Sequence, residues 1–139
     1  MNKNDMQRYV VAALDLLAKS PLTEGGQVEK AMAGKFASFG PTVYDMGLKP
    51  AVMLYSNATS DNKADRRPVV NAICDVMRIC HPESIQQCED LLSYVKPLQG
   101  LSLYNAKEEI LGVCVALKLA LRTFPTKSED KKATEGEAG

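Results

Sequence analysis

Between residues 105 and 124, apolar side chains recur on nearly every face of a helical period, and a proline follows at residue 125. Asn105 with Glu108 three residues later has the pattern of a capping box, and Pro125 stops a helix. A helix that is apolar all round needs neighbours on several sides, so the pattern predicts a central helix in a bundle. Its apolar residues are Ile110, Leu111, Val113, Cys114, Val115, Leu117, Leu119, Leu121 and Phe124.

The composition favours helices over sheets in the rest of the chain. The 139 residues include no Trp and three Phe, so the core depends on Leu, Val, Ala, Met and Ile. This length suits one domain. The sequence therefore predicts an all-α fold, a single compact bundle of about five to seven helices over residues 1–124. Residues 125–139 carry no large apolar side chain and are expected to form a disordered tail.

Prolines and one glycine divide the bundle into segments. Pro21, Pro41 and Pro82 mark helix ends, because the residue before a proline is disfavoured in the α region. Gly47 suits the C-terminal cap of a short helix. Helices are expected at residues 5–19, 27–39, 41–46, 48–58, 65 or 67 to 80, 82–95 and 105–124.

Targeting signals are not evident in the sequence. No apolar run reaches the roughly 18 residues of a transmembrane helix, and the first residues are too polar for a secretory signal. We therefore expect a cytoplasmic protein that does not contact a membrane. In that compartment its four cysteines should be reduced.

Few residues offer catalytic or metal chemistry. His81 is the only histidine and stands beside Cys80, and adjacent side chains rarely face each other productively. No CxxC or HxxxH pair with zinc-site spacing is present, and no glycine-rich phosphate loop. Residues 89–90 and 108–109 are acidic pairs, but helix neighbours point about 100° apart. The sequence predicts no catalytic residue, no metal site, no cofactor and hence no enzyme.

Basic residues gather on two helical faces, although the chain as a whole is neutral. Lys plus Arg and Asp plus Glu each number 17, which argues against coating nucleic acid through bulk charge. Local stripes remain: one helix carries three basic residues within about 60° of one another, and another begins with two arginines. Such stripes can hold a phosphate backbone or simply form a solvated face. The first stripe is Lys107, Lys118 and Arg122; the second is Arg67, Asn71 and Arg78, with Arg66 just before it.

The segment from Lys35 to Tyr55 resembles a known family. It contains a Lys-aromatic-x-Ser stretch, then Gly47-Leu48 opening an apolar helix that ends on an aromatic residue. Further on, Tyr104 precedes an acidic residue and a long apolar helix with basic side chains. In these features the chain is similar to the small subunit of type III-B CRISPR–Cas (Cmr) effector complexes, over most of residues 5 to 124.

The resemblance implies a non-enzymatic, all-α subunit that stacks head to tail in several copies. The resulting filament would follow the guide RNA–target RNA duplex, between a backbone subunit and a large signalling subunit, and contact target-strand phosphates through basic faces. RNA cleavage and nucleotide cyclisation would belong to neighbouring subunits. The residues expected to contact phosphates are Lys35, Lys49, Arg66, Arg67, Lys118 and Arg122.

Two other functions remain open from the residues alone. A protein-interaction module without nucleic acid is favoured by the neutral charge and the low aromatic content, since base-stacking surfaces need exposed Tyr or Phe. A small enzyme with Cys80 or Cys88 as nucleophile is the weakest alternative, because the chain has no second histidine.

Overall fold

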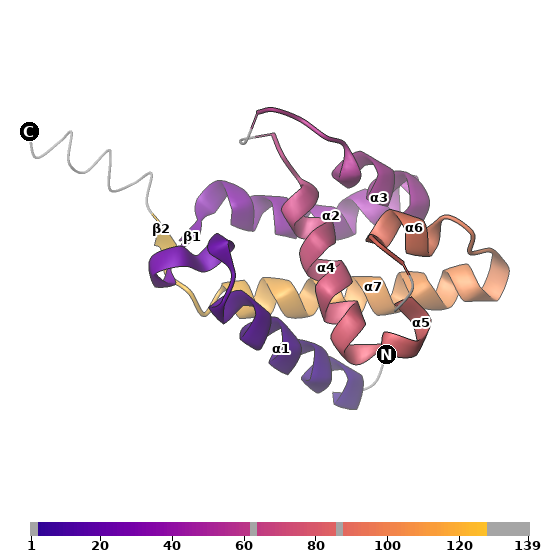
Figure 1. The fold of residues 1–139 in the computed structure, drawn as a ribbon, viewed down its shortest axis with the longest axis horizontal. Helices are drawn as coiled ribbons and strands as arrows, with labels where there is room; N and C mark the ends of the chain where they lie inside the picture. Colours follow the sequence, from indigo (N-terminus) through magenta and orange to yellow (C-terminus); the bar gives the residue numbers. More distant parts are fainter. Residues whose placement is uncertain (1–2, 62–63, 86–87, 128–139) are drawn as a thin grey trace, which may run out of the picture.

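The computed structural model describes residues 3–61, 64–85 and 88–127 and folds them almost entirely into helices (Figure 1). The all-α prediction is confirmed. The elements are α1 (Lys3–Ala18), the 3-10 helix η1 (Pro21–Gly26), β1 (Val28–Glu29), α2 (Lys30–Met46), α3 (Leu48–Ser56), α4 (Arg67–Cys80), α5 (Pro82–Ile85), α6 (Leu91–Val95), α7 (Gly100–Leu121) and β2 (Thr126–Lys127).

The long helix α7 organises the bundle. It packs against α1, α2 and α4, and in Figure 1 it runs the length of the molecule with α4 crossing it. Ile110, Val113 and Leu117 are fully buried, as the prediction of a central helix requires. Val115 and Leu119, however, are 40% and 44% exposed. The helix is therefore enclosed on several sides but open along one apolar face.

The predicted helix break at Gly40-Pro41 is wrong, because α2 continues through Pro41 to Met46. Phe36 and Phe39 before the proline and Val43 after it are all buried. Both halves of α2 thus contribute to one core face, and this packing outweighs the hydrogen bond that proline cannot donate. The predicted end at Gly47 is confirmed: its φ is 92° and its N–H donates to the carbonyl of Val43 at 2.8 Å.

The predicted helix over residues 82–95 is also wrong, since α5 ends at Ile85 and α6 begins at Leu91. The carboxylate of Asp90 accepts a hydrogen bond from the N–H of Ser93 at 2.8 Å and caps α6. The Arg78 guanidinium donates to the carbonyls of Cys88 and Glu89 at 2.9 and 2.7 Å. A side-chain cap and an arginine thus bind backbone groups that a continuous helix would pair internally.

The last helix starts one turn earlier than predicted, at Gly100 with Gln99 as its cap, so the capping box at Asn105 is not formed.

The predicted boundary of the C-terminal tail at residue 125 also needs correction. Val28 pairs in parallel with Thr126, and the Val28 N–H donates to the carbonyl of Pro125 at 3.0 Å. Residues 125–127 therefore belong to the fold, whereas residues 128–139 of the predicted disordered tail lie outside the described residues.

Candidate nucleic-acid interface

Lys35 and Lys49 both bind backbone carbonyls within the protein. The Lys35 ammonium, on α2, donates to the carbonyl of Asp65 at 2.9 Å and so holds the loop that leads into α4. The Lys49 ammonium, on α3, donates to the carbonyl of Lys96 at 3.0 Å, at the C-terminal end of α6. These two lysines join elements of the fold, and a phosphate would have to compete with those contacts.

Arg66 and Arg67 lie at the start of α4. The Arg67 guanidinium grips both carboxylate oxygens of Asp65 at 2.9 and 3.0 Å and also donates to the carbonyl of Thr59. This contact lowers the pKa of Asp65 below its ordinary value of 3.8. Arg66 lies 5.6 Å from the centre of the Tyr55 ring and is exposed. Lys35, Arg66 and Arg67 thus meet around the entrance to α4, where Arg67 is already paired.

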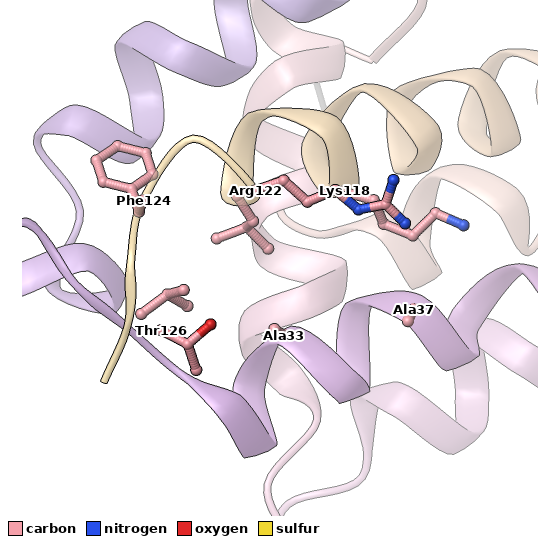
Figure 2. A pocket seen from close by; sticks show the side chains of 8 residues that line it. Ala33, Ala37, Lys118, Arg122, Phe124 and Thr126 are labelled. Atoms are coloured by element: carbon pink, nitrogen blue, oxygen red, sulfur yellow. The ribbon is translucent and has the colours of Figure 1, made fainter. Parts of the chain in front are cut away.

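Lys118, which is half-buried, and Arg122, which is exposed, form a basic pair at the end of α7. They are four residues apart on α7 and so share one face, and both line a pocket of about 210 Å³. In Figure 2 the two side chains extend in the same direction, toward the side of Ala37. Neither makes an ion pair with a carboxylate within residues 3–61, 64–85 and 88–127. The pocket is lined by Val28, Ala33, Ala37, Lys118, Leu121, Arg122, Phe124 and Thr126.

Local structure explains why two cations can stand unpaired here. Both lie at the C-terminal end of α7, where the helix dipole presents partial negative charge and stabilises cations. The facing turn of α2 supplies only Ala33 and Ala37, whose small side chains leave the pocket open. The site thus offers two positive groups beside a shallow apolar floor, which suits an anion better than a catalytic step.

Cys114, four residues before Lys118 on α7, does not carry a reactive thiol. Burial raises the pKa of Cys114 to about 11, with Lys118 acting weakly in the opposite direction. The thiol contacts the carbonyl of Phe36 at 3.6 Å. Cys114 therefore stays a neutral thiol near neutral pH and contributes packing rather than nucleophilic chemistry.

A second cluster, which the sequence did not reveal, joins α1, α4 and α7. The buried hydroxyl of Tyr9 shares a hydrogen bond of 2.7 Å with Nε2 of His81, and Nδ1 of His81 lies 3.9 Å from a carboxylate oxygen of Glu109. Burial, with a smaller effect of Glu109, raises the pKa of Tyr9. His81 turns toward Tyr9, while the Cys80 thiol contacts the carbonyl of Arg8. No local pattern links residues 72 positions apart.

Comparison of the chain with known proteins does not indicate a function. Scans against family models, curated proteins and solved structures gave no match to this chain. Among the described residues, no three His, Cys, Asp or Glu side chains gather as metal ligands would. No helix in that same part of the chain has the length and apolar character needed to cross a membrane.

Proposed function

We propose that this protein is a non-catalytic small helical subunit of an RNA-guided CRISPR effector complex. In this role it stacks in several copies along the guide RNA–target RNA duplex and contacts phosphates of the target strand. Its partners are the duplex, the backbone and large signalling subunits, and further copies of itself in the cytoplasm. The observation that carries the proposal is the unpaired Lys118–Arg122 pair on α7.

The chemistry of this pair suits a phosphate backbone. Arginine presents a planar fork of donors that matches phosphate oxygens, whereas lysine adds a compact positive charge. The pocket of about 210 Å³ beside them leaves space for a phosphate group next to both cations. Such contacts position a nucleic acid without reading its sequence, as a subunit serving many guides requires.

The other four residues rank below this pair. Arg66 is exposed and its contact with Tyr55 leaves donors open, so it is the next residue for phosphate contact. Lys35, Lys49 and Arg67 already bind backbone or carboxylate groups. Their replacement should act partly through the fold, which makes them poorer tests of RNA contact.

The test is RNA binding by the assembled complex with the K118A/R122A double variant. We expect weaker binding and a dependence of log affinity on log salt that is shallower by about 2, one for each lost phosphate contact. K3A/K19A, which removes the exposed lysine at the start of α1 and the one directly after its end, is the matched control and should leave the salt dependence unchanged. Equal salt slopes for both variants would exclude the phosphate role.

A second candidate is a protein-interaction module without nucleic acid. It is favoured by the exposed apolar side chains along α7, because Leu101, Val115 and Leu119 are 74%, 40% and 44% exposed. Purification of the tagged chain from its own cells separates the two functions. Capture of proteins without RNA, lost in L101S/L119S but kept in K118A/R122A, would favour this module over the CRISPR subunit.

A further inference from the structure

Two tyrosines near the N-terminal end of α7 project into solvent. Tyr44, near the end of α2, is 75% exposed, and Tyr104, in the second turn of α7, is 56% exposed. Side chains this open contribute little to the core. Exposed aromatic rings are instead the groups on which nucleic-acid bases stack, because every base has a π-face.

Lys107 joins these tyrosines into one cluster. Its ammonium lies 5.9 Å from the centre of the Tyr44 ring, at the outer limit of a cation–π contact. Tyr104 precedes Lys107 by three residues, so both occupy one side of α7, and α2 packs against α7. Glu108 follows Lys107 and points about 100° away from it. The cluster therefore comprises one exposed ring in contact with the Lys107 ammonium and a second exposed ring three residues before Lys107 on α7.

We propose that Tyr44, Lys107 and Tyr104 bind unpaired bases of a single-stranded nucleic acid. The tyrosine rings stack on the bases, and Lys107 turns from the Tyr44 ring to the adjoining phosphate. This inference deepens the proposed function, on which it rests for the nature of the ligand. Bases within a duplex already stack on one another, so the cluster selects unpaired nucleotides over the paired RNA that Lys118 and Arg122 contact.

The geometry of α7 connects the two sites. Tyr104, Lys107, Lys118 and Arg122 fall within about 60° on the helix and span about 27 Å from first to last at 1.5 Å per residue. One strand lying along this face would meet rings at one end and unpaired cations at the other. Val115, which is 40% exposed, lies between the two ends of this face and about 20° from its edge, and it gives the middle an apolar side chain.

The test measures binding of a short oligouridylate and of a duplex of equal length to the full chain, by fluorescence anisotropy. We expect Y44A and Y104A each to weaken single-strand binding about fivefold or more, with little effect on duplex. Y44F and Y104F should bind like the unaltered chain, because phenylalanine keeps the ring. M53A, which truncates another exposed apolar side chain, is the control and should change neither affinity.

Several outcomes would overturn the stacking site. They are no detectable single-strand binding by the unaltered chain, equal losses for single strand and duplex, and loss of a protein partner from Y44A/Y104A without a change in oligonucleotide affinity. A loss in K118A/R122A alone would overturn stacking and keep the phosphate contact. A loss in the tyrosine variants alone would keep stacking and reject the phosphate contact. Circular dichroism confirms that these surface variants fold.

Discussion

At Tyr9 a single hydroxyl ties three helices together through His81 and Glu109. We expect Y9F to lower the free energy of unfolding by about 1–2 kcal/mol, because it leaves a ring nitrogen of His81 without its partner. Urea unfolding followed by circular dichroism measures the change. The matched control is Y104F, which removes a hydroxyl from an exposed ring and should stay within about 0.5 kcal/mol of the unaltered chain. Equal stability of the two variants would mean that the Tyr9–His81 bond contributes nothing.

Asp65 makes the stability of the chain depend on pH. The Arg67 hydrogen bonds lower its pKa in the folded state, so the ionised carboxylate stabilises the fold above the ordinary value of 3.8. This stabilisation is lost as the pH falls through the lowered pKa. We therefore expect D65N to be less stable than the unaltered chain at pH 7, and the difference to shrink on acidification. Urea unfolding at a series of pH values measures it.

A partner variant checks the cause of this pH dependence. R67Q removes the guanidinium that donates to Asp65, so it should show a similar loss of stability at neutral pH, and this loss should also shrink in acid. The double variant D65N/R67Q should be no less stable than the less stable of the two single variants. A difference between D65N and the unaltered chain that is constant with pH would show that Asp65 acts through packing alone.

At the scale of helices, Pro41 lies inside α2 on an exposed position. Replacing it by alanine restores a backbone N–H, so we expect P41A to raise the free energy of unfolding by about 1–3 kcal/mol. Pro50 is the matched control: it is the third residue of α3, where the N–H has no helical partner. P50A should lower stability by less than about 1 kcal/mol, through the unfolded chain. A loss of stability in P41A would contradict this expectation.

The helices that pack on the core were predictable, and their ends were less so. Apolar spacing located α1, α3 and α4, each of which buries one face, and α7, which is buried on several sides. The break between α5 and α6 depends on Arg78, whose acceptor carbonyls lie ten and eleven residues away and leave no local pattern. The Asp90 cap of α6 could have been read from Asp90 and Ser93. Between α5 and α6, the tertiary contacts of Arg78 thus outweighed the local sequence pattern that predicted one continuous helix.

The basic stripe was predictable, but which cations stay open was not. Helical spacing placed Lys107, Lys118 and Arg122 on one face, as the structure has them. It could not reveal that Lys35 reaches the loop before α4, or that Tyr44 from α2 meets Lys107. Those facts depend on how α2 packs against the rest of the bundle, which no single helix encodes.

Over the whole molecule, a neutral chain can still present a positive face because its charges pair unevenly. Of the 17 basic and 17 acidic residues, several pair locally, as Arg8 does with Asp5 at 3.8 Å and Arg78 with Asp75 at 3.2 Å. These ion pairs neutralise basic side chains on α1 and α4. The two cations at the C-terminal end of α7 have no such carboxylate partner in the described ranges, so they add two uncompensated positive charges to one side of that helix.

The parallel pairing of Val28 with Thr126 joins the segment before α2 to the segment after α7. We expect a chain shortened to residues 1–124 to be less stable than one shortened to 1–127 by about 1–2 kcal/mol, because the buried Val28 N–H loses its acceptor on Pro125. Hydrogen exchange reports it directly: the Val28 amide should be protected in the longer chain and exchange freely in the shorter one. T126A in the longer chain is the control, since it keeps the main-chain bonds and should retain that protection. Equal protection of the Val28 amide in both shortened chains would show that the pairing of β1 with β2 does not stabilise the fold.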